Sequence, residues 1–549
     1  MRYRILVTDE IDPEGVALLA GEPDFDVDEV PTLPPQELMV RIPAYDALVG
    51  RSATKVSAEL LRAATRLKVI GRAGVGVDNI ALDTATELGI AIINAPAGNT
   101  IAVAELFFGV VLSLLRHLPR AHESMHAGRW ERSSLLGAEL NGRTLGIVGL
   151  GRIGGEIAAR AHAFDMPLVA YDPYITESRF QSLRVHRAAS LDELLDASDI
   201  VTVHTPLTEE TRGMIGKREL ARLAPSAIVV NMARGGIVDE DALAQAVAAR
   251  KLAGAAVDAF EKEPLRADHP LTKLPDVFLT PHIGASTAEA QRNVAVDACA
   301  AVRDALLSGE YSRSINVPEG EHGKWEELRP ARMLTRRAAA IGRAILAAQG
   351  TSVVGRIDVR GSHALAPARE TLVASAALGV LEAVLEQERL NLINARTLAE
   401  GRGIELSFTE ALDGSQPETA IASRAVEVRL TGGMNDITVG GIAYGHGGDE
   451  NGDGAFRITR IGAFRVDVYP RDTLVILTNR DVPGVIGRVG TLLGEAGVNI
   501  AEYHQARLAQ GGEALAAVSV DGGVGEEVKR RLLELPDVRS VTVVSFRKE

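Results

Sequence analysis

The sequence predicts an α/β protein with two doubly wound parallel-sheet domains, followed by an α+β domain and a small ferredoxin-like domain. Short apolar strands alternate with helical segments through residues 3–307. A glycine-rich turn, residues 149–154, stands between one of these strands and a helix. The segment 472–549 has the order strand, helix, strand, strand, helix, strand. The alternation is typical of parallel sheets covered by helices, and the last order is typical of a ferredoxin-like sheet.

The composition limits the classes of partner. The chain has 549 residues, 46% of them hydrophobic, so it can bury the cores of several domains. Its formal net charge of −14 argues against nucleic acid as the main partner, and an anionic substrate would need a local basic pocket. The single cysteine, Cys299, excludes an intrachain disulfide and a cysteine-based metal site, and we expect no metal.

Targeting and membrane signals are not evident in the sequence. The first residues enter a strand directly and lack the pattern of a signal peptide. The apolar stretch 106–115 is too short to span a bilayer. We therefore expect a soluble, cytoplasmic protein with no membrane partner.

The first domain is expected to be discontinuous, with residues 1–98 and 286–316. A helix at 288–307 follows the second domain, and its position suggests that the chain returns to the first. One long helix, 101–127, is expected to lead into the second domain. The expected strands of the first domain are 5–8, 25–30, 47–50, 69–73 and 91–94.

The second domain, residues 99–285, carries a dinucleotide-binding fingerprint. An apolar strand leads into Gly149, Gly151 and Gly154. The first glycine permits a tight turn, the second lets the backbone approach a pyrophosphate, and the third lets the helix pack closely on the strand. The N-terminus of that helix attracts phosphate groups. These features predict a bound dinucleotide.

The end of the next strand indicates which dinucleotide is bound. Asp172 stands there, where a carboxylate accepts hydrogen bonds from both ribose hydroxyls and repels a 2′-phosphate. The nearest downstream arginine, Arg179, is too far along the chain to be an obvious 2′-phosphate partner. We therefore expect NAD rather than NADP.

Charged residues follow later strands of the second domain. Arg234, Glu263 and His282 come after strands whose carboxyl ends should share one edge of the sheet, where doubly wound sheets bind ligands. A single arginine is usually a surface cation, and a single histidine is more often structural than catalytic. Their grouping beside a dinucleotide turn favours a reaction site. The expected strands are 200–204, 227–231, 254–258 and 277–280.

The third domain, residues 317–471, has a different pattern of expected helices and strands. Helices are expected at 329–349 and 370–401, and strands at 352–360, 404–409, 426–430 and 437–444. Asp449, Asn451 and Asp453 resemble part of a calcium loop, but the closing glutamate is missing, so we expect a solvated hairpin tip. The fourth domain, 472–549, is expected from the pieces 474–478, 484–495, 498–507, 514–520, 526–535 and 541–546.

Several motifs together resemble those of the D-isomer-specific 2-hydroxyacid dehydrogenases. Within that family they are most similar to the long members that oxidise 3-phosphoglycerate with NAD. The third domain then resembles the intervening domain of those members, and the fourth resembles an ACT regulatory domain. The motifs span the whole chain and are residues 51–56, 71–79, 94–100, 149–154, 231–236, 281–285 and 480–487.

The resemblance implies that Arg234, Glu263 and His282 form the catalytic set. His282 would take the proton of the substrate hydroxyl as the C2 hydride leaves for the nicotinamide, a task that suits a side chain that titrates near neutrality. Glu263 would orient the imidazole ring and stabilise its protonated form. Arg234 would bind the substrate carboxylate through its planar guanidinium.

The resemblance also implies the residues that bind substrate and cofactor. Arg51 and Arg72 would supply positive charge for the substrate phosphate, although an ordinary solvated cation is an equal interpretation of Arg72. Further substrate contacts are implied at Ser52, Gly74, Val75, Gly76 and Asn99. Further cofactor contacts are implied at Arg152, Ile153, Pro206, Met232, Ala233, Asp258, Gly284 and Ala285, with Asp258 facing the nicotinamide carboxamide.

In the fourth domain, Asn479, Asp481 and Asn499 fall where relatives bind serine between subunits. This implies L-serine as an effector and a homo-oligomer, either a dimer or a tetramer. Asp481 stands at a position that can vary. The two asparagines are equally well interpreted as turn and helix-cap residues.

Taken together, these features predict oxidation of 3-phosphoglycerate to 3-phosphooxypyruvate, the first step of phosphorylated serine biosynthesis. A glyoxylate or hydroxypyruvate reductase is the nearest alternative, but such enzymes usually lack the two additional domains. An NAD-sensing corepressor is an alternative from another class, since it can keep the same triad; the ACT-like tail argues against it. The formate-oxidising members of the family have glutamine at the position of Glu263, so the glutamate here disfavours formate oxidation.

Overall fold

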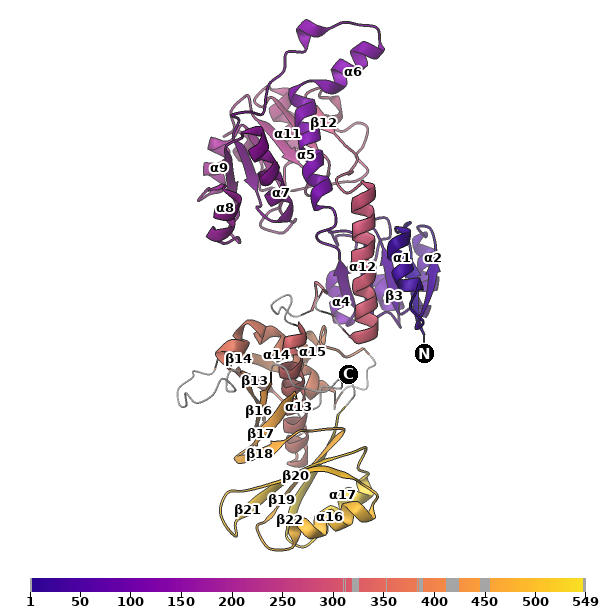
Figure 1. The fold of residues 1–549 in the computed structure, drawn as a ribbon, viewed down its shortest axis with the longest axis vertical. Helices are drawn as coiled ribbons and strands as arrows, with labels where there is room; N and C mark the ends of the chain where they lie inside the picture. The colour runs from indigo at the N-terminus through magenta and orange to yellow at the C-terminus, as the bar shows by residue number, and fades with distance from the viewer. Residues whose placement is uncertain are drawn as a thin grey trace.

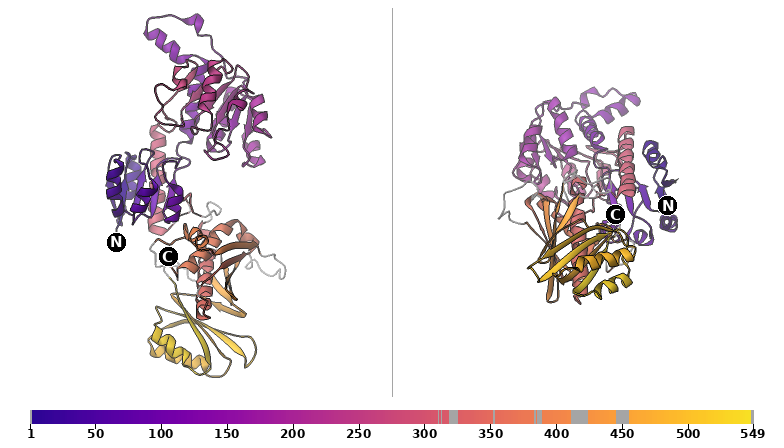
Figure 2. Two further views of the ribbon diagram at one scale, coloured as in Figure 1. Left: turned by 180° about the vertical axis from the view of Figure 1, so that it is seen from behind. Right: turned by 60° about the horizontal axis from the view of Figure 1, so that its bottom comes forward.

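The computed structural model of the chain consists of four units arranged along one long axis (Figures 1 and 2). The unit with the glycine-rich turn lies at one end, the N-terminal unit is next, and the C-terminal unit lies at the other end. Asp449, Asn451 and Asp453 fall outside the described residues. The structure describes residues 2–309, 311, 313–317, 325–351, 353–382, 384, 389–410, 424–444 and 455–546.

The first domain contains a parallel sheet of order β2-β1-β3-β4-β5. Its order reverses between β1 and β3, so the carboxyl ends of these two strands form a ligand-binding crevice of the kind found in doubly wound sheets. The strands are β1 (Tyr3–Val7), β2 (Phe25–Glu29), β3 (Ala47–Gly50), β4 (Val69–Arg72) and β5 (Ala91–Asn94). The helices are α1 (Pro13–Ala20), α2 (Pro35–Arg41), α3 (Ala58–Ala63) and α4 (Leu82–Glu87).

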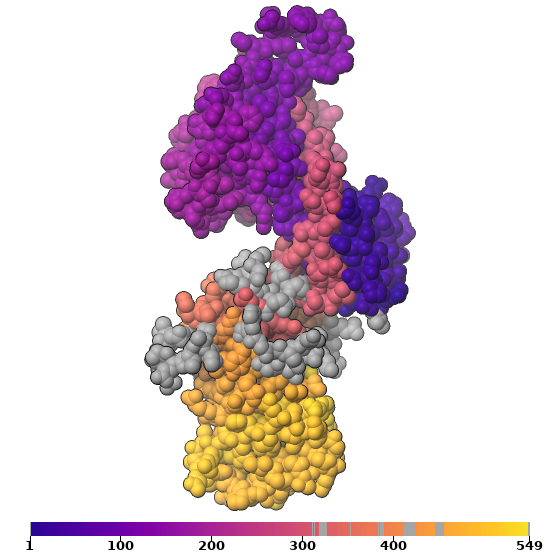
Figure 3. Space-filling model, in the orientation of Figure 1, coloured from indigo at the N-terminus to yellow at the C-terminus, as the bar shows by residue number. Residues whose placement is uncertain are grey.

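Helix α12 (Ala288–Ser308) follows the second domain but packs on the first (Figure 3). Its buried Val302 contacts the sheet where Gly71 leaves room, because a Cβ at position 71 would lie 2.5 Å from a methyl group of Val302. Beyond the helix, Ser314 and Asn316 hydrogen-bond to Ile92 on the edge strand β5. The chain therefore returns to the first domain after completing the second.

The second domain contains a parallel sheet of order β12-β11-β10-β9-β6-β7-β8. Its order reverses between β6 and β9, which creates a second crevice at the carboxyl edge. The strands are β6 (Leu145–Val148), β7 (Leu168–Tyr171), β8 (His186–Arg187), β9 (Ile200–Val203), β10 (Ile228–Asn231), β11 (Gly254–Val257) and β12 (Val277–Leu279). The helices include α5 (Thr100–Leu115), α7 (Arg152–Ala161), α8 (Glu177–Leu183), α9 (Leu191–Ala197), α10 (Lys217–Leu220) and α11 (Glu240–Ala248).

The prediction of one long helix over 101–127 is wrong. The segment forms α5 and α6 (Leu118–His126), and the second is bent by 64° from the first. His117 at the junction has a left-handed φ of 52°, and a proline in the first turn of α6 starts a new helix rather than continuing the old one. The helix and the loop after it project from the end of the molecule (Figure 1), where Trp130 and Leu136 are 79% and 89% exposed.

The third domain contains a mixed sheet of order β14-β13-β15-β16-β17-β18. The predicted helix over 370–401 is wrong, because α14 and α15 are separate helices joined by a non-helical segment at 389–394. The hairpin of β17 and β18 had no counterpart in the sequence prediction. The strands are β13 (Arg356–Gly361), β14 (Glu405–Glu410), β15 (Ala425–Gly432), β16 (Asn435–Ala443), β17 (Phe456–Ile461) and β18 (Phe464–Val468). The helices are α13 (Trp325–Ala348), α14 (Arg369–Leu381) and α15 (Ala395–Glu400).

One apolar helical stretch, His363–Leu381, has the length and composition of a membrane span. In the structure, 72% of that stretch is buried inside the protein, where α14 packs against α13 and the mixed sheet. Burial among other helices and strands is typical of the core helix of a folded domain.

The fourth domain confirms the predicted ferredoxin-like arrangement, with an antiparallel sheet of order β20-β21-β19-β22. The sheet face opposite its helices packs on the third domain, and Leu474, Ile476 and Val544 belong to the core of that domain. Arg337 of α13 lies over the ring of Phe546 at this junction. The elements are β19 (Thr473–Arg480), α16 (Val485–Glu495), β20 (Ile500–Arg507), β21 (Glu513–Val520), α17 (Glu526–Leu533) and β22 (Val538–Ser545).

Residues 389–394 also attach the third domain to the first. The side-chain amide of Asn391 donates to the carbonyl of Gly89 at 2.7 Å, and Nε of Arg389 donates to the carbonyl of Thr65 at 3.1 Å. Ile393 is buried in the core of the first domain. The third domain is thereby joined to both of its neighbours by shared apolar cores.

Candidate active site

The glycine-rich turn has the geometry that close approach of a ligand requires. Gly149 has a left-handed φ of 92°, and a Cβ there would lie 2.7 Å from the carbonyl of His204. A Cβ on Gly154 would lie 2.2 Å from the carbonyl of Gly149, so only glycine lets α7 pack this closely. At Gly151, by contrast, a Cβ would meet no described atom within 4 Å. The backbone at Gly151 and Arg152 is thus open to a phosphate at the helix N-terminus.

Asp172 lies beside this turn. Its Oδ2 accepts from the backbone N–H of Leu150 at 2.9 Å, and its Oδ1 accepts from that of Tyr174 at 3.0 Å. Arg179 lies closer to the turn than its sequence position suggested, because its Nη2 donates to the carbonyl of Gly151 at 3.4 Å. A cation therefore stands at the glycine-rich turn, where the dinucleotide is expected to bind.

His204 lies deep in the same crevice but is not suited to proton transfer. Its side chain is half-buried, and desolvation lowers the pKa of His204 from 6.5 to about 3. Its Nε2 is 2.7 Å from Oγ1 of Thr202. The imidazole is therefore neutral at physiological pH, and its role in the crevice is structural.

Two buried side chains shape the loops that carry the charged residues. Nδ2 of Asn231 donates to the carbonyl of Arg234 at 2.9 Å, and its Oδ1 accepts from the N–H of Ala233 at 3.2 Å. Asp258, 1% exposed, accepts from the N–H groups of Ile283 and Gly284 at 2.8 and 2.9 Å. Asp258 thus fixes the loop that begins at His282, in addition to the cofactor contact implied for it.

His282 and Glu263 are brought together by these loops. Nδ1 of His282 lies 2.8 and 2.9 Å from the two carboxylate oxygens of Glu263, and Oε1 of Glu263 also accepts from the N–H of Phe260 at 3.1 Å. With Nδ1 protonated and facing the carboxylate, Nε2 is the nitrogen that can accept a proton. The two side chains are 48% and 39% exposed, so a substrate has access to them.

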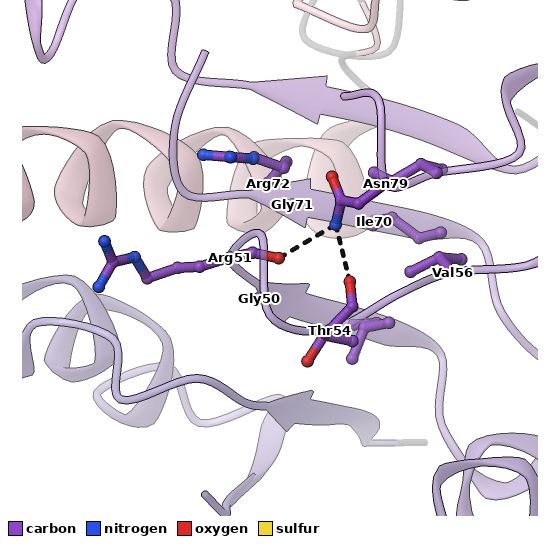
Figure 4. Close-up of a pocket in the computed structure, with 10 residues that line it drawn as sticks. Gly50, Arg51, Thr54, Val56, Ile70, Gly71, Arg72 and Asn79 are labelled. Atoms are coloured by element: carbon purple, nitrogen blue, oxygen red, sulfur yellow. Dashed lines mark hydrogen bonds between the residues drawn. The ribbon is translucent and has the colours of Figure 1, made fainter. Parts of the chain in front are cut away.

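The first domain contributes arginines to the same region. Arg51 follows β3 and Arg72 is the last residue of β4, and their side chains extend to the same side of a small pocket (Figure 4). Burial lowers the pKa of Arg72 to about 10, and the nearby positive charges of Arg234 and Arg51 act in the same direction. Arg234 of the second domain reaches across, with its Nε 3.0 Å from Oδ2 of Asp78. Three cations therefore converge between the two domains of an acidic protein.

A buried carboxylate holds the Arg51 loop. Oδ2 of Asp9 accepts from the backbone N–H groups of Arg51 and Thr54 at 2.7 and 2.9 Å. From the other side, the amide of Asn79 donates to the carbonyls of the same two residues at 3.1 and 2.7 Å (Figure 4). Asp9, Asp78 and Asn79 were not predicted as site residues from the sequence. An acidic residue two positions after β1, at the point where the sheet order reverses, was the available signal for Asp9.

The remaining predicted substrate residues lie around the junction of the two domains. Gly74 and Gly76 approach Arg72 and Arg234 so closely that a Cβ would lie 1.4 and 1.9 Å from their respective guanidinium nitrogens. Oδ1 of Asn99, at the start of α5, is buried and has no hydrogen-bond partner among the described residues. The other predicted substrate residues, Ser52 and Val75, follow β3 and β4. Of the other predicted cofactor residues, Ile153 is in the first turn of α7, and Pro206, Met232 and Ala285 follow β9, β10 and β12.

The predicted regulatory residues do not meet within one chain. Asn479 pairs with Ala514 across the sheet, whereas the carbonyl of Asn499 accepts from the N–H of Asp521. Positions 514 and 521 lie near opposite ends of β21, on the order of 20 Å apart at about 3.4 Å per residue. Asp481 accepts from Nη1 of Arg507 at 3.2 Å. A ligand that touches both asparagines therefore requires a second copy of the domain.

Comparisons with known proteins match two segments of the chain to family models. The model described as the NAD binding domain of D-isomer specific 2-hydroxyacid dehydrogenases matches residues 108–284, and the ACT domain model matches residues 473–537. The chain is 38% identical to a D-3-phosphoglycerate dehydrogenase of Bacillus subtilis, over 99% of this chain and 100% of the relative. It is 37% identical to the D-3-phosphoglycerate dehydrogenase of Archaeoglobus fulgidus, again over 99% of this chain and 100% of the relative.

Solved structures match the dehydrogenase portion. The TT0316 protein from Thermus thermophilus has a TM-score of 0.51 at 34% identity, over 55% of this chain and 96% of that one. A glyoxylate reductase from Paecilomyes thermophila has a TM-score of 0.52 at 30% identity, over 56% of this chain and 97% of that one. The full-length relatives thus share all four domains, whereas these two structures are similar to little more than half of the chain.

Proposed function

The chain belongs to the D-isomer-specific 2-hydroxyacid dehydrogenase family, and we propose that it oxidises 3-phospho-D-glycerate to 3-phosphooxypyruvate with NAD. Relatives named for this reaction match it over 99% of its length, including the third and fourth domains. The structural observation that carries the proposal is the convergence of Arg51, Arg72 and Arg234 between the first and second domains. The paired side chains of His282 and Glu263 lie, like Arg234, on loops that follow strands of the second domain. The reaction is the entry step of phosphorylated serine biosynthesis, which we place in the cytoplasm.

The charges of the substrate fit this arrangement. Arg234 would hold the carboxylate next to the reacting carbon through its planar guanidinium. Arg51 and Arg72 would bind the phosphate at the other end of the molecule. A substrate without a phosphate, such as glyoxylate, leaves these two cations without a partner, which disfavours the reductase alternative.

The reaction needs one proton acceptor and one hydride acceptor. Nε2 of His282 takes the proton of the C2 hydroxyl, and the carboxylate of Glu263 stabilises the imidazolium that forms. When bound at the glycine-rich turn, NAD would supply the hydride acceptor. The C2–H bond breaks as the C2=O bond forms, so the products are the 2-oxoacid, NADH and one proton. Arg234 stabilises the charge on the oxygen during this step.

We propose that the fourth domain binds L-serine in an assembly of at least two chains. Support comes from the ACT match and from the separation of Asn479 and Asn499, which a second copy would bring together. The exposed Trp130 and Leu136 on the arm that includes α6 supply a further apolar surface for a second copy. Serine offers an ammonium, a carboxylate and a hydroxyl, which suit the donors and acceptors of asparagine.

The experiment that tests the reaction is a steady-state assay of NADH formation from 3-phosphoglycerate. Reduction of hydroxypyruvate and of glyoxylate, measured on the same preparation, discriminates the reductase alternative. A turnover confined to the two short 2-oxoacids would overturn the proposal.

A further inference from the structure

A second glutamate–histidine pair lies behind the catalytic one. Glu240 is the first residue of α11, and His269 precedes a short 3-10 turn at Pro270–Lys273. Oε2 of Glu240 lies 3.4 Å from Nε2 of His269, and the two side chains are only 11% and 15% exposed. This pair touches none of the groups assigned to the reaction, so its burial calls for another role.

The hydrogen bonds define the protonation of this histidine. Nδ1 of His269 accepts from the backbone N–H of Leu271 at 3.3 Å. The ring proton therefore resides on Nε2, which faces the carboxylate of Glu240. Burial raises the pKa of Glu240, while the hydrogen bond from the backbone N–H of Glu261 opposes that shift.

The other oxygen of Glu240 holds the loop that carries Glu263. Its Oε1 accepts from the backbone N–H of Glu261 at 2.6 Å. On another side, Gly235 packs on the same peptide unit so closely that a Cβ there would lie 1.9 Å from the carbonyl carbon of Phe260. Two residues further on, Glu263 folds back to accept from the N–H of Phe260 and faces His282. The peptide between residues 260 and 261 is thus fixed from two directions.

From this geometry we infer that Glu240 and His269 are positioning residues for Glu263, and through it for His282. The inference rests on the proposed function, because the roles of Glu263 and His282 belong to that proposal. Glu240 fixes the peptide from which Glu263 projects, and His269 fixes the rotamer of Glu240. Without the hydrogen bond between Glu240 and this peptide, Glu263 would face His282 for a smaller fraction of the time. The imidazolium that forms in the reaction would then lose part of its stabilisation.

The test compares Glu240→Ala with Asp241→Ala, a matched control in the same turn of α11 whose side chain is exposed. We expect Glu240→Ala to lower kcat about 10-fold or more, because aligned acid–base groups contribute roughly 10²–10⁴-fold. The KM for 3-phosphoglycerate and the Kd for NADH should stay within about twofold, since Arg51, Arg72 and the fingerprint are untouched. Asp241→Ala should match the parent protein in all three.

The pH profile separates positioning from general destabilisation. The acid limb of kcat/KM should move to lower pH in Glu240→Ala, because a misaligned Glu263 stabilises the protonated imidazole less. The titratable groups that face Glu240 are His269, Glu261 and Asp241. The Asp241→Ala control measures the effect of Asp241 on the pH profile. A merely structural defect would lower activity without moving this limb.

Two results would overturn the inference while leaving the proposed function intact: parent-like kcat in Glu240→Ala, or reduced kcat with an unmoved acid limb. If Glu240→Ala does not bind NADH, His269→Asn replaces it as the test. Asparagine still accepts from the N–H of Leu271 but is too short to reach Glu240, so the same fall in kcat and shift are expected. A parent protein that does not oxidise 3-phosphoglycerate would instead refute the proposed function.

Discussion

Nε of Arg234 lies 3.0 Å from Oδ2 of Asp78, and this ion pair joins the loop after β10 to the loop after β4. Arg234 belongs to the second domain and Asp78 to the first. The first domain, which we expect to bind the substrate phosphate, therefore orients the arginine that we expect to bind the substrate carboxylate. Nη1 of Arg234 donates to the carbonyl of Ala233 at 2.8 Å, and Nη2 faces the backbone of Gly76. The guanidinium is held at two of its three nitrogens.

Loss of this orientation should be measurable. We expect Asp78→Ala to lower kcat/KM for 3-phosphoglycerate about 3- to 10-fold, which corresponds to roughly 1 kcal/mol and is typical of a partly exposed ion pair. Asp78→Asn should retain most of the activity, because the amide oxygen still accepts from Nε. Asp83→Ala, an exposed acid on α4, serves as the control in steady-state kinetics. Equal activity of Asp78→Ala and the parent would refute a positioning role for the pair.

Cofactor choice should depend on Asp172 and Arg179 together. Asp172→Ser removes the acceptor for the ribose hydroxyls and the repulsion of a 2′-phosphate, and it leaves Arg179 beside the turn. We expect kcat/KM with NAD to fall about 10-fold or more, since hydrogen bonds to charged groups contribute about 1.5–3 kcal/mol. Activity with NADP should rise, and Arg179→Ala in the same background should reverse that rise. An unmodified protein that uses both cofactors equally would contradict this expectation.

The half-buried His204 should make the second domain sensitive to acid. Its pKa is lowered from 6.5 to about 3 in the folded state, so only the unfolded state takes up a proton between these values. The contribution of the neutral ring to the free energy of unfolding is therefore fully present above pH 6.5. It is lost as the pH falls from 6.5 towards 3, by about 1.4 kcal/mol per pH unit. Hydrogen exchange of the β9 amides measures this slope.

The variant His204→Gln should lose that slope, because glutamine does not titrate. His186→Gln is the matched control, since His186 is on the same sheet with a side chain that is 72% exposed. A slope unchanged in His204→Gln would show that the ring is protonated in the folded state.

Serine binding should require assembly. Because Asn479 and Asn499 lie near opposite ends of one sheet, we expect calorimetry to detect serine binding only in a dimer or a larger species. Asn479→Ala should abolish the signal, whereas Asn435→Ala, at the exposed first residue of β16 in the third domain, should not. The absence of serine binding to the full-length oligomer at millimolar concentration would remove the regulatory proposal and leave the dehydrogenase proposal standing.

The fold class could be predicted well from the sequence because the relevant signals are local. Alternating apolar strands and helices predicted both parallel sheets, and Gly149 and Gly154 occupy positions where no side chain fits. The order of elements in the fourth domain was likewise confirmed. Each of these features depends on residues close together in the chain.

Several features were missed, one of them local and the others dependent on distant residues. The break at His117 requires a left-handed residue that the apolar periodicity of 101–127 conceals. The hydrogen bonds of Asp9 to the Arg51 loop join residues 42 positions apart, and Asp78 meets Arg234 across 156 positions. Arg179 was placed too far from the turn because separation along the chain does not measure distance once a helix folds back over a strand.

The most direct test of the central claim is the initial rate of NADH formation from 3-phosphoglycerate and NAD, in the parent protein and in His282→Ala. The account predicts turnover by the parent that exceeds its use of glyoxylate and hydroxypyruvate. It also predicts a loss of about 10²–10⁴-fold in the variant, with unchanged NADH binding. No oxidation of 3-phosphoglycerate by the parent, or near-parent turnover by His282→Ala at neutral pH, would contradict it.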